Sequence, residues 1–276
     1  MHFVLSPAPR TQRYRVESAA RLGQGGRLLE YHEVTQLELT LLGADADAWV
    51  FRLRTQDVQL RSNNELFQWT RDVNALLDEL VLRVGPEGRV RGVLNEADLL
   101  ARWPAHRQQL AQAYGARPGA ADMLTALDQA LHTPGFVHHH LAQHGLSDFL
   151  FPGLYGSYGP EPPTVPKVLP NFFGALDLPL RVQHRATADP APGQAVAVHT
   201  LGQLDEAQLD ADGFRRLLKD ATDTYDIKTD LVADYETTYS FDSQHWPQAA
   251  ELFLAVEAGG SAFQYALGRQ LTTLPA

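Results

Sequence analysis

Apolar and polar residues alternate one by one through much of the first sixty positions of the chain. Leu37, Leu39 and Leu41 share one side of an extended backbone, while Glu38 and Thr40 take the other. Successive side chains of a strand point to opposite faces, so this period of two predicts half-buried antiparallel strands. Turn sequences rich in glycine and aspartate separate three of these strands, near residues 11–22, 27–42 and 48–61.

The pattern changes to a helical one after a predicted hairpin near residues 80–94. Asn95 is the expected N-cap, and the apolar residues that follow recur at helical spacing. Similar spacing predicts two more helices before residue 150, and Pro104 predicts a kink or a break in the first one. The residues of the first apolar stripe are Leu99, Trp103, Leu110 and Tyr114.

A proline-rich stretch separates this helical block from the second half of the chain. Residues 152–170 hold six prolines and three glycines in nineteen positions. This composition predicts an ordered crossing or a linker, with neither a helix nor a central strand. Strand patterning then resumes over residues 177–272, around one short helix near residues 214–221.

Strands at both ends of the chain and helices in the middle, without βαβ alternation, predict an α+β fold. We expect a single α+β domain over residues 1–276, with strands over 11–94, a helical insertion over 95–150, the crossing over 152–170 and a β-rich region over 177–272. The simplest assembly is one large curved antiparallel β-sheet, a half-barrel, with the helical insertion packed on its concave face.

Charge and composition exclude several classes of function. The net charge is −10 and no stripe of Lys and Arg offsets the acidic excess, so nucleic-acid binding is not expected. The absence of cysteine excludes disulfides, thiolate metal sites and cysteine nucleophiles. No apolar run is long enough to span a membrane, and the N-terminal apolar run is too short for a secretory signal. The default expectation is a cytoplasmic protein, or a periplasmic one if the sequence lacks a leader segment.

Histidines near residue 140 are the first candidates for a metal site. His140 and His144 share a helix face, which suits two zinc ligands, but Leu141 stands where a zinc protease of the zincin type has glutamate. A calcium loop with Gly213 at its sixth position fails, because Lys219 occupies the place of the bidentate glutamate. Dinucleotide and phosphate-loop motifs are also missing, so we expect no metal site and no cofactor.

Acidic residues between positions 205 and 242 allow an enzymatic alternative. Asp230, Asp234 and Glu236 share one face of a predicted strand, where they form either a carboxylate pair in a cleft or a solvated outer face. The nucleophile elbow of a serine hydrolase is not expected, because Tyr155 replaces the first glycine of the G-x-S-x-G motif. We assign no catalytic residue.

Aromatic residues gather around the proline-rich crossing. They either plug the mouth of the curved sheet as part of its core or line a pocket for an apolar ligand. Our candidate ligand-binding residues are Trp103, Phe149, Phe151, Tyr155, Tyr158 and Phe172.

Long antiparallel strands, a helical insertion and a proline-containing crossing resemble the half-barrel lipoprotein carriers of the LolA and LolB type and other β-rich bacterial proteins. The final segment adds to this resemblance, with a strand over residues 235–242, a turn that holds Trp246 and Pro247, and Gly259 and Gly260 before a last strand. The resemblance implies a cavity between sheet and helices that receives acyl chains or another apolar partner. The chain departs from the family in lacking a signal peptide and a lipidated cysteine.

These observations favour a non-enzymatic binding protein that holds an apolar small molecule, or a segment of a protein partner, between its sheet and its helices. One alternative is a structural or adaptor subunit of a bacterial assembly, joined through the edges of its long strands. The other alternative is a hydrolase that uses the acidic strands or the histidines.

Overall fold

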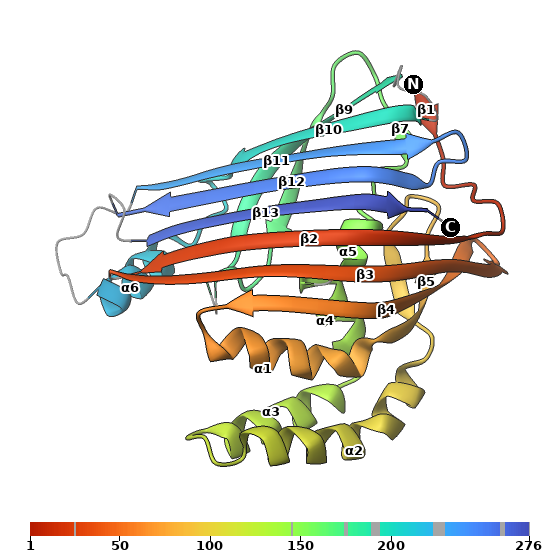
Figure 1. Ribbon diagram of the computed structural model, residues 1–276. Coiled ribbons are helices and arrows are strands. Elements are labelled where there is room, and N and C mark those ends of the chain that lie inside the picture. Colours follow the sequence, from red (N-terminus) through yellow and green to blue (C-terminus); the bar gives the residue numbers. More distant parts are fainter. Residues whose placement is uncertain are drawn as a thin grey trace.

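The computed structural model describes the chain except for residues 25, 145, 174–175, 189–193, 223–229, 260–262 and 276. Most of the described strands form one antiparallel sheet of eleven strands, in the order β6-β5-β4-β3-β2-β13-β12-β11-β10-β9-β8 (Figure 1). The sheet bends without closing, which confirms the predicted α+β half-barrel. A separate two-stranded sheet pairs β1 (His2–Phe3) with β7 (Gly156–Ser157). The strands of the large sheet are β2 (Thr11–Gln24), β3 (Arg27–Asp45), β4 (Ala48–Ser62), β5 (Glu79–Val84), β6 (Val90–Val93), β8 (Thr164–Leu169), β9 (Leu178–Ala188), β10 (Gln194–Leu204), β11 (Leu231–Asp242), β12 (Pro247–Ala258) and β13 (Phe263–Leu274).

The middle of the sheet is a pairing between the first and the last of its strands along the chain. β2 and β13 are antiparallel neighbours over their whole length, from the pair Gln24–Phe263 to the pair Arg13–Leu274. On either side of this pairing, strands that are consecutive in the large sheet's chain order lie next to each other. The β2–β13 pairing, called the seam below, therefore joins two halves of the sheet, β2–β6 and β8–β13.

Helices pack on the concave side of the sheet. The helical insertion consists of α2 (Glu96–Tyr114), α3 (Ala120–Leu131), α4 (Phe136–His144) and α5 (Leu146–Leu150), and α4 and α5 lie behind the sheet in Figure 1. α2 runs on through Pro104, so the predicted break is absent. Outside the insertion lie α1 (Glu65–Asn74), followed by one 3-10 turn (Ala75–Leu77), and α6 (Ala211–Thr222).

Asn95 shows how tertiary contacts override a local signal. It stands at the N-terminus of α2, as predicted, but its side chain makes no capping hydrogen bond. Its Oδ1 instead accepts the Val81 N–H at 2.9 Å, and its Nδ2 donates to the Glu79 carbonyl at 3.1 Å. The amide therefore ties the start of the helical insertion to β5.

Two apolar clusters cover the concave face. The first lies between the helical insertion and strands of both halves of the sheet, β2–β5 and β10–β13, and the second lies under α6 against β9 and β11–β13. Burial alternates along the strands as predicted, and β11 buries every second residue from Leu231 to Phe241. The largest buried side chains include Tyr14, Phe51, Trp103, Phe241 and Trp246 in the first cluster and Phe173, Phe214 and Phe263 in the second.

Local features block both edges of the large sheet. Residues 164–169 of the proline-rich crossing form the edge strand β8, where Pro166 is tolerated because an edge strand needs only one set of ladder hydrogen bonds. At the other edge α4 packs against β6, and the His138 Nε2 lies 3.2 Å from the Val90 carbonyl oxygen. Both features disfavour the addition of a strand from another chain.

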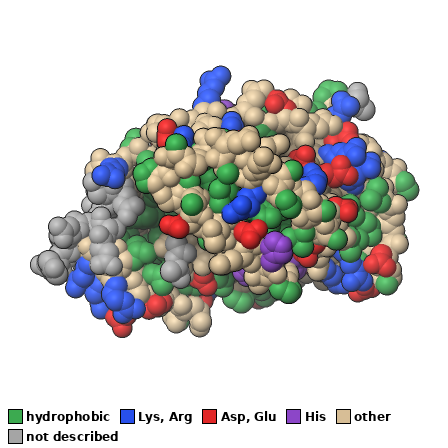
Figure 2. Space-filling model, turned by 90° about the horizontal axis from the view of Figure 1, so that it is seen from below, with side chains coloured by type: hydrophobic (Ala, Val, Ile, Leu, Met, Phe, Trp, Pro, Cys, Tyr) green, Lys and Arg blue, Asp and Glu red, His purple; other side chains and the backbone are tan. Residues whose placement is uncertain are grey.

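The surface mixes charges of both signs. On the face shown in Figure 2, Lys and Arg alternate with Asp, Glu and apolar side chains, and neither sign forms a continuous field. Among the described helices, none combines the length and the apolar character that crossing a bilayer requires.

Candidate functional site

A narrow hollow of about 50 Å³ lies on the concave face between the two apolar clusters. We call it the groove. Its floor consists of side chains from six neighbouring strands, β8 to β13, and residues 149–154, which we call the roof segment, cover it. The groove is lined by Phe149, Pro152, Leu154, Lys167, His184, Thr200, Tyr235, Thr237, Tyr239, Leu252 and Arg269.

The register of the sheet aligns polar side chains across the floor of the groove. His184 lies opposite Thr200, and Thr200 lies opposite Thr237. Thr237 is followed on the next strand by Leu252, which lies opposite Arg269. We call His184, Thr200, Thr237 and Arg269 the polar row. They lie on the concave face of the sheet, and Ser18 and Glu33 continue the row on the same face beyond the seam.

Hydrogen bonds fix part of the polar row and of the roof segment. The His184 Nδ1 lies 2.8 Å from the Thr200 Oγ1, and the Arg269 Nε donates to the Ser18 Oγ at 3.0 Å. The Tyr239 hydroxyl donates to the Phe149 carbonyl at 3.1 Å, which holds the roof segment over β11. The two threonines are buried, with exposures of 2% and 3%.

Two cations reach the groove and rest on aromatic rings. The Lys167 Nζ is 5.5 Å from the centre of the Tyr235 ring, and the Arg269 Cζ is 5.5 Å from the centre of the Phe149 ring. Within the described part of the chain, neither cation forms an ion pair with a carboxylate, and the described lining of the groove contains no acidic residue. The groove is therefore positive inside a protein whose net charge is −10.

This environment disfavours a charge on His184. Burial lowers the pKa of His184 from its ordinary value of 6.5, and the positive charges of Lys167 and Arg89 lower it further. The neutral imidazole is therefore the main form at pH 7.

We expect the stability of the protein to fall as the pH drops below about 6.5, with His184 contributing to the loss. Because its pKa is lower in the folded state, the unfolded chain binds more protons in this range, so the stabilisation present above pH 6.5 is lost toward lower pH. Urea unfolding of H184Q between pH 5 and 8 should show a shallower pH dependence than the wild type. The exposed His199, changed to Gln, is the matched control, and an H184Q profile that coincides with the wild type would refute the prediction.

The aromatic candidates from the sequence divide among three places. Phe149 lines the groove, while Phe151 and Tyr155 pack within the first apolar cluster. The Phe151 ring lies 5.0 Å from Phe51, and the Tyr155 hydroxyl donates to the His245 carbonyl at 2.7 Å. Burial raises the pKa of Tyr155 well above its ordinary value.

The other three candidates lie away from the floor of the groove. Tyr158 is half-buried and stacks on Phe3 at 5.7 Å, and burial raises its pKa to about 12. The Trp103 indole N–H donates to the Asp128 Oδ1 at 2.6 Å, between α2 and α3. Phe172 belongs to the second apolar cluster. The structure therefore does not gather the six candidates into one site.

The histidine and acidic candidates do not converge on the groove. His140 stacks on Phe136 at 5.8 Å, and the side chain of His144 lies outside the described part. Among the described residues no group of three His, Asp or Glu side chains is arranged to hold a metal ion. Asp234 and Glu236 are exposed on the face of β11 opposite the buried one, which agrees with a solvated outer face.

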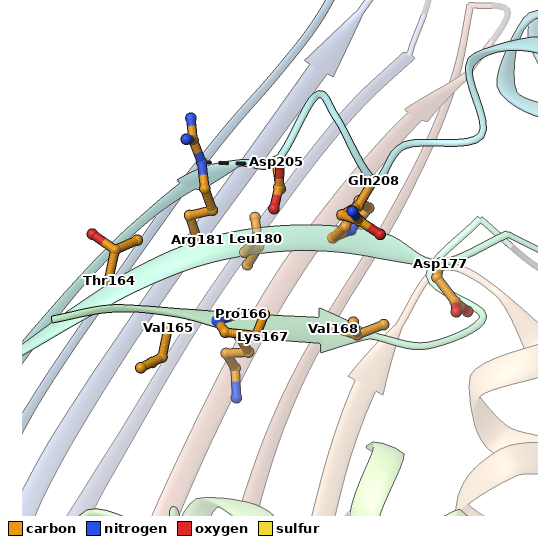
Figure 3. Close-up of a pocket in the computed structure, with 11 residues that line it drawn as sticks. Thr164, Val165, Pro166, Lys167, Val168, Asp177, Leu180, Arg181, Asp205 and Gln208 are labelled. Atoms are coloured by element: carbon orange, nitrogen blue, oxygen red, sulfur yellow. Dashed lines mark ion pairs between the residues drawn. The ribbon is translucent and has the colours of Figure 1, made fainter.

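A second hollow, of about 580 Å³, lies at β8 and β9 and shares Lys167 with the groove (Figure 3). Thr164 and Val168 of β8, Arg181 of β9 and Gln208 contribute to its lining, and the Arg181 Nε lies 4.0 Å from the Asp205 Oδ1. The Lys167 side chain points away from Arg181 and Asp205 (Figure 3), and it lines both hollows. This wide, open hollow brings together no group of catalytic side chains.

Comparisons with known proteins return only distant likenesses in architecture. No protein-family model and no curated protein sequence matches the chain. A lipovitellin structure described for lipid–protein interactions matches with a TM-score of 0.46 and 9% identity, over 98% of this chain and 25% of that one. The chain thus spans about a quarter of the lipovitellin chain.

Two bacterial structures are also similar. An outer membrane lipoprotein-sorting protein domain from Vibrio parahaemolyticus has a TM-score of 0.17 and 9% identity, over 96% of this chain and 84% of that one. A DUF1329 family protein from Desulfovibrio piger has a TM-score of 0.15 and 7% identity, over 95% and 85%. The weak resemblance to LolA-like proteins is confirmed, and at these scores it extends to architecture alone.

Proposed function

We propose that the protein is a non-enzymatic binding protein that holds an amphipathic ligand between its sheet and the roof segment. The observation that carries the proposal is the polar row. It crosses the concave face of the sheet between two apolar clusters, at a place where a purely structural protein would gain stability from aliphatic side chains.

The size of the groove limits how a ligand enters. A volume of about 50 Å³ admits a few water molecules or one small polar group. A longer ligand requires the roof segment to move. Hydrogen bonds from the Gly153 N–H to the Gly88 carbonyl, at 3.1 Å, and from the Tyr239 hydroxyl to the Phe149 carbonyl hold this segment in place.

The groove favours binding over hydrolysis. His184 and Thr200 form a contact between an imidazole and a hydroxyl, but none of the described lining residues is a carboxylate that could orient the imidazole. Thr200 is also buried beneath its neighbours. The blocked edges of the sheet make the adaptor alternative less favourable than ligand binding.

Titration with 11-(dansylamino)undecanoic acid tests the proposal. We expect saturable binding with a blue-shifted emission, and a loss of affinity of about tenfold or more in T237F, whose larger side chain fills the groove. The neighbouring Thr238 has the opposite orientation on β11, so T238F is the matched control and should bind as the wild type does.

Urea unfolding distinguishes a filled groove from a misfolded variant, and the smaller T237L provides a second, milder change. The proposal is wrong if the wild type shows no saturable binding, or if folded T237F and T237L both keep the wild-type affinity.

A further inference from the structure

We infer, on the basis of the proposed function, that the ligand carries an oxyanion, a carboxylate or a phosphate, and that Lys167 and Arg269 receive it in the groove. The observation behind this inference is a pair of cations that reach one semi-enclosed hollow and contact only aromatic rings and uncharged groups among the described residues.

Several arginines on the sheet have a carboxylate partner. Arg15 pairs with Glu17 at 2.5 Å, Arg21 with Glu30 at 2.8 Å, and Arg54 with Glu79 at 2.7 Å. Arg269 forms no such ion pair among the described residues, and its guanidinium lies near the Phe149 ring and the Ser18 hydroxyl.

The surroundings of the two cations are mostly buried. Tyr239, Thr237 and Phe149 each expose only 3% of their surface, and Lys167 and Arg269 themselves are half-buried. The chain has only three lysines, and one of them reaches this hollow. A bound oxyanion would supply the missing negative charge.

The effect of neighbouring charges on His184 supports the same conclusion. Lys167 and Arg89 both disfavour the protonated form of this imidazole. The same positive charges would attract an anion bound in the groove and compensate its charge.

Donors suited to an oxyanion face the same space. Arg269 has five N–H donors, and Ser18 and Tyr31 hydrogen-bond to this side chain without using all of them. The Lys167 ammonium and the Thr237 hydroxyl, which lies on the floor of the groove, add further donors. Charge-assisted hydrogen bonds of this kind are about twice as strong as neutral ones.

Matched probes test the inference. We expect 11-(dansylamino)undecanoic acid to bind at least tenfold more tightly than its methyl ester, because the ester lacks the negative charge and is larger by only one methyl group. K167Q and R269Q should each lose about tenfold in affinity for the acid while their affinity for the ester changes less than twofold. R269K should retain most of the affinity for the acid.

The control is R185Q, which removes the same charge from the exposed neighbour of His184 and should bind both probes as the wild type does. Equal affinities of the wild type for acid and ester would overturn the inference. So would K167Q and R269Q proteins that fold, by urea unfolding, and keep the affinity for the acid.

A calorimetric titration with sodium phosphate and with sodium acetate separates an amphiphile head group from a free anion. If these ions bind and both variants abolish the binding, while neither dansyl probe binds, the oxyanion site stands and the proposed amphipathic ligand fails. If the ester binds as well as the acid, the proposed function stands and the oxyanion inference fails. If no probe and no ion binds, both fail.

Discussion

Replacing Asp242 with alanine is expected to lower the free energy of unfolding by about 3–4 kcal/mol. The Asp242 carboxylate is 8% exposed and organises the turn between β11 and β12. Its Oδ1 accepts the N–H groups of Gln244 and Trp246 at 2.9 and 2.8 Å, and its Oδ2 lies 2.7 Å from the Arg10 Nη2. Alanine would leave the Arg10 guanidinium, which lies 4.4 Å over the Trp246 ring, without its counter-charge.

Urea unfolding followed by tryptophan fluorescence measures this loss. D242N keeps an acceptor for the two backbone N–H groups and removes the charge, so it should lose less than D242A. D234A, at an exposed position of the same strand, should stay within about 0.5 kcal/mol of the wild type. A D242A protein as stable as D234A would show that the carboxylate does not stabilise the turn.

Replacing Gly88 with alanine is expected to cost about 2–4 kcal/mol. Gly88 has a φ of 79°, in the left-handed region that disfavours a Cβ. A Cβ at this position would also overlap the ring of Tyr155. That ring cannot move aside easily, because it packs 5.2 Å from Phe3 and its hydroxyl is bonded to the His245 carbonyl.

The Gly135→Ala variant separates the cost of the left-handed backbone conformation from the cost of the overlap with Tyr155. Gly135 has a φ of 76°, but no atom lies within 4 Å of the position that its Cβ would take. G135A should therefore show only the backbone cost, about 1 kcal/mol. If G88A loses no more stability than G135A, the overlap with Tyr155 does not contribute to the loss of unfolding free energy.

Much of the fold is predictable from local patterns. The strands predicted at residues 11–22, 27–42 and 48–61 are found at 11–24, 27–45 and 48–62, because a period of two is a direct consequence of strand geometry. The seam is not predictable in this way, since no local signal specifies which distant strand β2 will pair with. Pro166 illustrates a related difficulty, because a proline is tolerated in a strand whose position at the edge only the whole sheet determines.

The candidate site is less accessible to sequence reasoning. Aromatic side chains near the crossing are visible in the sequence, and Phe149 does line the groove. Most of the polar row escapes notice, because an isolated threonine or arginine in a strand normally marks the solvated face. The usable signal is the alternation of side chains along a strand, because residues two positions apart lie on the same face. Thr237 lies two positions from both Tyr235 and Tyr239, and so shares their buried face. Arg269 and Leu271 are related in the same way.

The seam also has a consequence for biosynthesis. Ser18 and Arg269 face each other across it although 251 positions separate them in the chain. On the ribosome, β2 emerges early and leaves one long edge without its partner until β13 has been translated. The nascent polypeptide therefore exposes an unpaired strand through most of its synthesis, and molecular chaperones that shield such edges would protect it from aggregation during that interval.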